Sequence, residues 1–236
     1  MKLAIIGYGK MGRMVASLAP EYGFTVHARV DPNSKEAGDD LAQAVGADVA
    51  IEFSTPEVAV GNVETLAKLR IPVVVGTTGW LKEMHRVQAA VGKHGIGVVW
   101  SPNFSVGVNV FLRVVREAAR LLADEAEYGA WAWEIHHDTK KDAPSGTMLK
   151  LVDEMKAAGY PRPIDVSSNR AGRHPGTHEI GFDSAADTIT LRHAARSREG
   201  FARGALKAAQ WLTAGMTEGA AKQGVFEFSD ILFTKR

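Results

Sequence analysis

Fourteen consecutive residues in the middle of the chain combine the side-chain types needed to transfer protons to an anionic substrate. The segment reads Glu134-Ile135-His136-His137-Asp138-Thr139-Lys140-Lys141-Asp142-Ala143-Pro144-Ser145-Gly146-Thr147 and precedes an apolar helical run over residues 148–155. Imidazoles exchange protons near neutral pH, and lysine supplies a positive charge. Ser145 is a candidate N-cap, and the first amides of the helix after it can hold a carboxylate. The segment therefore predicts a site for a small anionic substrate.

Each of these groups also has an ordinary structural interpretation. Adjacent side chains of a strand point to opposite faces, so His136 and His137 share a site only if their strand ends there. Residues 131–136 alternate large apolar side chains with smaller or polar ones, which predicts a strand ending near the histidines. Lys140 and Lys141 are also compatible with a solvated turn. It is the presence of all these groups before one helix start that favours a site.

The N-terminus carries the pattern of a dinucleotide site. An apolar run over residues 2–6 leads into Gly7-Tyr8-Gly9-Lys10-Met11-Gly12, which is followed by a helical pattern. In such a G-x-G-x-x-G loop the first glycine permits a tight turn, the second lets the backbone approach a pyrophosphate, and the third allows close helix–strand packing. A second apolar strand, residues 25–30, ends at Asp31, which is expected to bond the adenosine ribose.

The composition excludes several functional classes. Lys and Arg total 28 against 27 Asp and Glu, a net charge of +1 with no long basic run, so nucleic acid is not an expected partner. The absence of cysteine excludes disulfides and thiolate chemistry, and the eight histidines form no ligand motif, so no metal is expected. No apolar stretch approaches the roughly 18 residues of a membrane span. Residues 1–6 fit a first strand rather than a signal peptide, and we expect a cytoplasmic protein without membrane contact.

The order of the elements predicts an α/β fold with two parts. Over residues 1–105, strands and helices alternate as in a Rossmann-type doubly wound parallel sheet. From residue 106 the pattern changes to α+β with a mixed sheet. The expected strands are 2–6, 25–30, 48–53, 72–75, 97–100, one around Trp131, 178–182, 188–193 and 225–228, and the expected helices are 11–19, 57–70, 80–93, 109–123, one ending at Met155, and 201–213. Residues 167–177 are expected to form a polar stretch containing Gly and Pro.

The fourteen-residue segment resembles the signature E-x-H-H-x-x-K-x-D-A-P-S-G-T of the 4-hydroxy-tetrahydrodipicolinate reductases, also called dihydrodipicolinate reductases, of lysine synthesis. Every fixed position of that signature is matched. The Gly7–Gly12 loop, Gly76-Thr77-Thr78-Gly79, residues 101–107 and residues 201–205 resemble the family as well, so the resemblance runs nearly end to end. It implies that residues 1–105 and 198–236 form the dinucleotide-binding domain. Residues 106–197 would form a substrate-binding and oligomerisation domain of a homotetramer.

The resemblance also implies a role for each matching residue. His136 and Lys140 match the catalytic proton-transfer residues, and His137 matches a substrate ligand. Gly146 and Thr147 match the pair that holds a substrate carboxylate, and we expect Ser145, at the same helix start, to lie with them at the substrate. The cofactor contacts match Gly7, Tyr8, Gly9, Lys10, Met11, Gly12, Asp31, Gly76, Thr77, Thr78, Ser101, Pro102, Asn103 and Phe104. The last two loops follow apolar strands, where open parallel sheets bind ligands.

The expected cofactor is NADH, NADPH or both. Asp31 favours NADH because a carboxylate repels a ribose 2′-phosphate, and Pro32 stands where the family often has an arginine. Lys10, Arg13 and Lys35 are candidates to compensate, or they are plain solvated charges. We expect the chain to use both cofactors with a tilt towards NADH.

The reaction implied by the resemblance is reduction of 4-hydroxy-tetrahydrodipicolinate, a small dicarboxylate, to tetrahydrodipicolinate and water in the diaminopimelate route to lysine. One alternative is a related nicotinamide-dependent dehydrogenase of an amino or imino dicarboxylate such as aspartate. The other is a non-catalytic dinucleotide sensor, which the presence of His136 and Lys140 disfavours. A substrate panel separates the first alternative, and cofactor binding without oxidation would identify the second.

Overall fold

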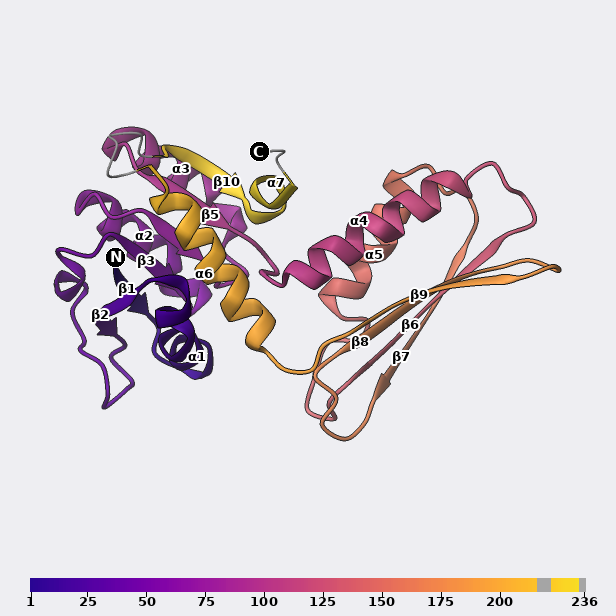
Figure 1. The fold of residues 1–236 in the computed structure, drawn as a ribbon, viewed down its shortest axis with the longest axis horizontal. Helices are drawn as coiled ribbons and strands as arrows, with labels where there is room; N and C mark the ends of the chain where they lie inside the picture. The colour runs from indigo at the N-terminus through magenta and orange to yellow at the C-terminus, as the bar shows by residue number, and fades with distance from the viewer. Residues whose placement is uncertain (216–221, 234–236) are drawn as a thin grey trace. The chain divides into compact units, whose positions relative to one another are not determined.

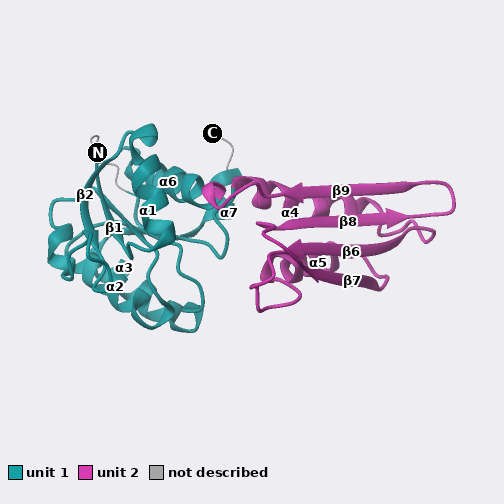
Figure 2. Cartoon of the chain, turned by 90° about the horizontal axis from the view of Figure 1, so that it is seen from below, with its two compact units in different colours: residues 1–105, 201–236 teal, residues 106–200 magenta. Residues whose placement is uncertain are grey.

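The computed structural model describes residues 1–215 and 222–233 and divides into two compact units (Figure 2). Unit 1 comprises residues 1–105 and 201–236, and unit 2 comprises residues 106–200. Residues 216–221 and 234–236, which the sequence assigns to the nucleotide domain, lie outside the described residues.

Unit 1 is built on a six-stranded sheet in the order β10-β5-β4-β3-β1-β2, and every neighbouring pair is parallel (Figure 1). Its central strands are buried on both faces, as the continuous apolar runs in the sequence require. The strands are β1 (Lys2–Ile6), β2 (Thr25–Val30), β3 (Val49–Glu52), β4 (Val73–Val75), β5 (Gly97–Trp100) and β10 (Gly224–Glu227). The predicted doubly wound parallel sheet is confirmed.

Helices cover both faces of this sheet. They are α1 (Lys10–Leu18), α2 (Pro56–Lys68), α3 (Met84–His94), α6 (Glu199–Thr213) and the short α7 (Phe228–Phe233). Buried residues of α2 and α3 join one core cluster with the sheet, while α1 and α6 lie on the opposite face (Figure 1). Two expectations need correction. Residues 81–83 form a 3₁₀ turn, so α3 begins only at Met84, and the strand expected over 225–228 ends at Glu227 because Phe228 opens α7.

Unit 2 is a four-stranded mixed sheet in the order β7-β6-β8-β9. β7 pairs parallel with β6, whereas β8 pairs antiparallel with both β6 and β9. The helices α4 and α5 pack on one face of it (Figure 1). The elements are α4 (Val106–Leu121), β6 (Gly129–His136), α5 (Gly146–Ala157), β7 (Ile164–Arg170), β8 (Thr177–Asp183) and β9 (Thr188–Ala194). The predicted second domain with a mixed sheet is confirmed.

The expectation of a polar stretch over residues 167–177 needs correction, because its first residues belong to β7, which spans residues 164–170. Ile164 and Val166 pack into the core of unit 2, but the next two side chains on the same face are Ser168 and Arg170. A strand whose buried face changes from apolar to polar lacks the alternation that marks a strand in sequence. The reason for those polar residues is the site described below.

None of the helices in the described ranges is both long enough and apolar enough to cross a membrane.

Candidate active site

A pocket of about 440 Å³ lies at the carboxyl ends of the strands of unit 1. The strand order reverses between β1 and β3, and ligands of doubly wound sheets bind at such a switch point. Three loops that follow β1, β3 and β4 contribute the walls. The lining residues are Gly9, Lys10, Met11, Phe53, Ser54, Pro56, Gly76, Thr77 and Thr78. The structure thus brings together two of the loops that the sequence assigns to the cofactor.

The glycine loop needs its glycines for different reasons. Gly7 has a φ of +87°, and a Cβ there would lie 2.3 Å from the carbonyl oxygen of Phe53. At Gly12 a Cβ would lie 2.2 Å from the carbonyl oxygen of Gly7, so this glycine permits the close packing of α1. At Gly9 a Cβ would meet no atom within 4 Å. Gly9 is therefore open to a ligand, while Gly7 and Gly12 are required by the fold.

Asp31 lies at the end of β2 and braces the glycine loop. Its carboxylate accepts the N–H of Tyr8 at 2.8 Å and the N–H of Asn33 at 2.9 Å. The guanidinium groups of Arg13 and Arg29 lie 5.2 Å and 5.4 Å from the centre of the Tyr8 ring. Two arginines therefore stand close to the predicted ribose site.

Arg13 is held by an ion pair with Glu36. This hydrogen bond raises the pKa of Arg13 and lowers the pKa of Glu36. The sequence indicates Arg13 but not Arg29, because a residue inside a strand gives no sign of which loop its side chain reaches.

The loop from Ser101 to Phe104 is not among the residues that line the pocket. The hydroxyl of Ser101 donates to the carbonyl oxygen of Asn103 at 2.8 Å and accepts its N–H at 3.1 Å. Phe104 is buried, with its ring centre 5.0 Å from that of Phe228, while Pro102 is exposed. These bonds make the loop a compact turn in which Phe104 belongs to the core.

Glu52 is a buried carboxyl group beside the pocket that sequence reasoning missed. It ends β3, and its Oε1 accepts the N–H of Ser54 at 3.0 Å and the side-chain amide of Asn62 at 3.4 Å. Burial raises the pKa of Glu52 above its usual value, against the lowering effect of these hydrogen bonds. The group therefore supports the Ser54 side of the pocket.

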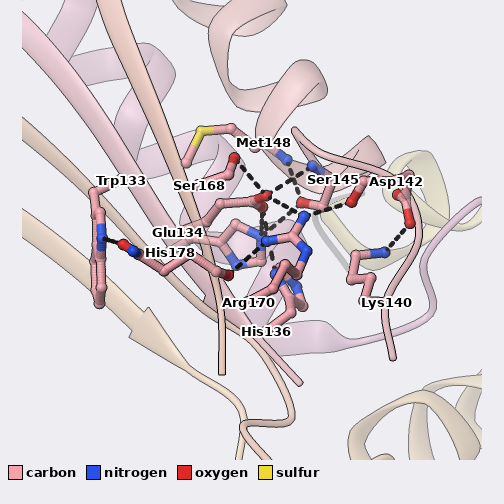
Figure 3. A network of polar contacts seen from close by, with 11 residues as sticks. Trp133, Glu134, His136, Lys140, Asp142, Ser145, Met148, Ser168, Arg170 and His178 are labelled. Atoms are coloured by element: carbon pink, nitrogen blue, oxygen red, sulfur yellow. Dashed lines mark hydrogen bonds and ion pairs between the residues drawn. The ribbon is translucent and has the colours of Figure 1, made fainter. Parts of the chain in front are cut away.

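Unit 2 contains a buried polar cluster around Glu134 (Figure 3). The side chains of Glu134 and His136 point to the same face of β6 because they are two residues apart. Register places His178 of β8 and Ser168 of β7 on either side of Glu134, and Arg170 beside His136. The exposed fractions are 0% for Glu134, 7% for His136 and 5% for His178.

Three donors converge on one oxygen of Glu134. Oε1 accepts the Ser145 N–H at 2.9 Å, the Ser168 hydroxyl at 2.9 Å and Nη2 of Arg170 at 2.8 Å. The second oxygen, Oε2, lies 3.5 Å from Nδ1 of His136 and 3.4 Å from Nε2 of His178. Burial raises the pKa of Glu134, but the groups around it outweigh burial and hold that pKa well below its usual range, so the carboxylate is ionised at neutral pH.

His136 is neutral in the same environment. Burial lowers its pKa to about 4; Glu134 opposes this shift, and His178, Lys140 and Arg170 add to it. Its Nε2 lies beside Gly176, where a Cβ would come within 2.9 Å of it. Gly176 has a φ of +139°, so backbone conformation and close approach both favour glycine at this position.

Ser145 caps α5, as the sequence predicts. Its hydroxyl accepts the N–H of Met148 at 3.2 Å and lies 3.1 Å from Nε2 of His178. The Ser145 side chain is buried and engaged inside unit 2, whereas Gly146 and Thr147 form the first turn of α5. A Cβ at Gly146 would meet no atom within 4 Å, which leaves room for a ligand at the helix start.

Lys140 and His137 lie on the loop between β6 and α5. The Lys140 ammonium donates to Oδ1 of Asp142 at 2.6 Å. Nδ1 of His137 lies 2.8 Å from the hydroxyl of Thr139, and the strand ends at His136, as two histidines sharing one site would require. The predicted proton-transfer and anion-binding groups thus lie on one continuous segment, from the end of β6 through this loop to the start of α5.

The Glu134, His136 and His178 side chains each offer one ligand atom, all within 4.8 Å of one another. A cation bound there would meet the Arg170 guanidinium, which already bonds the same carboxylate. Its positive charge disfavours a divalent ion at this position.

Three residues of the cluster are not among those that the sequence predicts for the site: Ser168, Arg170 and His178. The signal for His178 was parity: it occupies an inward position with Ile180 and Phe182, where an apolar residue is expected. No comparable signal marks Ser168 and Arg170, because β7 was not recognised as a strand.

Comparisons with known proteins identify the same family for both units. The family model "Dihydrodipicolinate reductase, N-terminus" matches residues 1–104, and the model "Dihydrodipicolinate reductase, C-terminus" matches residues 107–232. A 4-hydroxy-tetrahydrodipicolinate reductase of Christiangramia forsetii is 33% identical over 98% of each chain. One of Archaeoglobus fulgidus is 34% identical over 98% of this chain and 100% of the relative.

A solved structure shares the fold. The dipicolinate-bound dihydrodipicolinate reductase of Paenisporosarcina sp. TG-14 superposes with a TM-score of 0.77 at 22% identity, covering 98% of this chain and 99% of the other. Two family models together cover nearly the whole chain, and two relatives are more than 30% identical over nearly all of it. The chain belongs to the dihydrodipicolinate reductase family.

Proposed function

We propose that this protein reduces 4-hydroxy-tetrahydrodipicolinate to tetrahydrodipicolinate in the diaminopimelate route to lysine, with a reduced nicotinamide cofactor. The observation that carries the proposal is the succession of His136 at the end of β6, Lys140 on the next loop and the α5 start after it. The same chain has a pocket at the glycine loop of unit 1. The names of the relatives support the same substrate.

The reaction requires one hydride, one proton and the loss of one water. The bound nicotinamide supplies the hydride, and the protein supplies the proton and holds the substrate. The first amides of α5, at Gly146 and Thr147, hold one carboxylate, because a helix start carries a partial positive charge. Lys140 and His137 hold the other.

His136 and Lys140 together neutralise the charge that develops on the substrate. The neutral imidazole of His136 has a low pKa because it is buried. A substrate dianion beside it raises that pKa, since a nearby negative charge favours the protonated ring. His136 then takes up a proton and delivers it to the substrate ring, on which hydride addition leaves a negative charge. Lys140 stabilises that charge.

The pocket of unit 1 is proposed to accept NADH and NADPH, with a tilt towards NADH. Asp31 supports NADH because its carboxylate lies at the predicted ribose site. Arg13 and Arg29 support some use of NADPH, but Arg13 is engaged by Glu36.

We propose a homotetramer built on unit 2, in the cytoplasm, where the reduced cofactor and the substrate meet. The support for assembly is the sheet face opposite α4 and α5. It carries the Trp131 and Trp133 side chains half-exposed, and Trp131 lies against Gly181, where a Cβ would come within 2.1 Å of the indole. A broad half-exposed face with tryptophans is typical of an interface. Light scattering during size-exclusion chromatography gives the mass.

The test measures oxidation of the reduced cofactor by its absorbance, with freshly generated substrate, for wild type, His136→Ala and Lys140→Ala. We expect prompt oxidation by wild type and losses on the order of 10²-fold or more in kcat for both variants. If the cofactor is oxidised only with the imine of another dicarboxylate, such as the one whose reduction gives aspartate, the protein is a related dehydrogenase. Cofactor binding without any turnover would identify a sensor.

A further inference from the structure

The Glu134 carboxylate has two oxygens with different surroundings. Oε1 is saturated by the Ser145 N–H, the Ser168 hydroxyl and the Arg170 guanidinium. Oε2 faces the two imidazoles of His136 and His178, at 3.5 Å and 3.4 Å. Within the described part of the chain, Oε2 and Nδ1 of His136 are both buried and neither forms a hydrogen bond, so each is the polar group available to the other. A carboxylate fixed by three donors thus presents its free oxygen to the ring that the proposed mechanism uses.

This arrangement determines where the proton of a neutral His136 lies. An ionised carboxylate only accepts hydrogen bonds, so the ring nitrogen that faces it is the one that carries hydrogen. That nitrogen is Nδ1, which leaves Nε2, on the Gly176 side of the ring, with the lone pair. In catalytic histidines the group behind the ring sets the tautomer in this way.

His178 connects the same carboxylate to the helix start. Its Nε2 lies 3.4 Å from Oε2 of Glu134 and 3.1 Å from the hydroxyl of Ser145. Ser145 in turn caps α5 through Met148 and gives its own N–H to Glu134. The first turn of α5 is therefore tied to Glu134 by two routes.

We propose that Glu134 and His178 are positioning residues for the reaction: Glu134 fixes His136 in the Nδ1–H tautomer, and His178 fixes the carboxylate-binding start of α5 to the same group. One buried carboxylate thereby sets the geometry of both the proton-transfer group and the anion site. The inference rests on the proposed function for its kinetic consequences, but its structural part does not.

The structural part is tested by long-range ¹H–¹⁵N correlation spectra of ¹⁵N-histidine-labelled protein at neutral pH, without substrate. We expect His136 to show a protonated Nδ1 and an unprotonated Nε2 in the wild type. In Glu134→Gln the amide can donate to Nδ1, and the ring is expected to shift towards the Nε2–H form. A wild-type His136 in the Nε2–H form would overturn the inference. Because no turnover is involved, failure of the proposed reaction leaves this result unaffected.

The kinetic part uses variants of His178 with a matched control. His193 lies opposite His178 on β9 and is also an inward-facing imidazole, but it has no contact with Glu134 among the interactions of the described residues. We expect His178→Leu to raise KM for the substrate about tenfold, His178→Gln to recover most of that loss, and His193→Gln to leave KM unchanged. Equal losses in His178→Leu and His178→Gln would contradict positioning through a hydrogen bond.

Glu134→Gln is expected to lower kcat on the order of 10²-fold, the usual contribution of acid–base catalysis, with cofactor affinity unchanged. If this variant fails to fold, Ser168→Ala removes one of the three donors to Oε1 and leaves the charge in place. It should then lower kcat severalfold without changing the His136 tautomer. An unchanged kcat in whichever of the two variants folds would overturn the role of Glu134.

Discussion

The Lys140 ammonium lies 2.6 Å from Oδ1 of Asp142, so the cation proposed to receive a substrate carboxylate already binds a carboxylate of its own loop. The Lys140 hydrogen bond lowers the pKa of Asp142, and the backbone amide of Gly146 lowers it further. Asp142 therefore binds one of the groups proposed for the substrate and interacts electrostatically with another, from an exposed position that a ligand can displace.

We expect Asp142→Asn to tighten substrate binding. Removing the charge frees Lys140 and the helix start, so a larger fraction of the protein is ready to bind, and KM should fall on the order of threefold. The measurement is KM for the substrate, together with the inhibition constant of dipicolinate. Asp138→Asn is the control, since it removes one charge from the same loop without a Lys140 contact among the described interactions. A higher KM in Asp142→Asn would mean that Asp142 holds Lys140 in its active position.

Cofactor choice is expected to respond to Glu36. In Glu36→Gln the ion pair to Arg13 is lost, so the guanidinium next to Tyr8 and Asp31 becomes available to a 2′-phosphate. We expect the ratio of kcat/KM for NADPH to that for NADH to rise about fivefold, in the range of one exposed charge pair. Asp39→Asn removes an exposed charge from the same loop and should leave the ratio unchanged. An unchanged ratio in both variants would exclude Arg13 from the cofactor site.

Much of the fold could be predicted because the decisive patterns are local. Buried parallel strands are continuous apolar runs, and the glycine loop joins a strand to a helix within a few residues. The N-cap at Ser145 and the strand end at His136 are local as well. The missed strand β7 has a physical cause: its inward side chains Ser168 and Arg170 are polar because they satisfy Glu134, a partner more than thirty residues away.

For the same reason, the sequence identifies only some of the residues of the candidate site. The signature placed His136, Lys140 and the α5 start, but Glu134 stood in it without a role. Its function depends on His178, which only the antiparallel register of β6 and β8 brings opposite to it. Register between distant strands follows from the whole pattern of the sheet, and no short motif records it.

The stability of unit 2 is expected to fall as the pH drops below neutrality. His136 has a pKa of about 4 in the folded state, below the ordinary value of 6.5, so the unfolded chain binds more protons between these values. The stability that depends on neutral His136 is complete above pH 6.5 and is lost as the pH falls towards 4, with a total on the order of 3 kcal/mol. Burial also lowers the pKa of His193, which acts in the same direction.

Denaturant unfolding at several pH values between 7 and 4 checks this expectation. His136→Asn removes the titrating ring and should flatten the pH dependence, whereas His27→Asn, at an exposed ring of unit 1, should not. The ionised Glu134 affects the pH dependence of stability only at lower pH. Because its pKa is depressed in the folded state, its stabilising effect is lost only below its unfolded pKa near 4. A wild-type stability that stays constant from pH 7 to 5 would contradict a buried neutral His136.

Alanine at Gly9 and alanine at Gly12 are expected to reduce different properties: cofactor affinity at Gly9 and stability at Gly12. A methyl group at Gly12 would overlap the carbonyl oxygen of Gly7 at 2.2 Å, so Gly12→Ala should destabilise unit 1 by about 1–3 kcal/mol. A methyl group at Gly9 meets no protein atom within 4 Å, so Gly9→Ala should fold with a cost of at most about 1 kcal/mol for a poorer N-cap. The same methyl group points into the pocket loop that a pyrophosphate must approach, and dinucleotide affinity should fall at least about tenfold. Thermal unfolding and cofactor titration of both variants separate the two effects. Wild-type cofactor affinity in Gly9→Ala would place the pyrophosphate away from this loop.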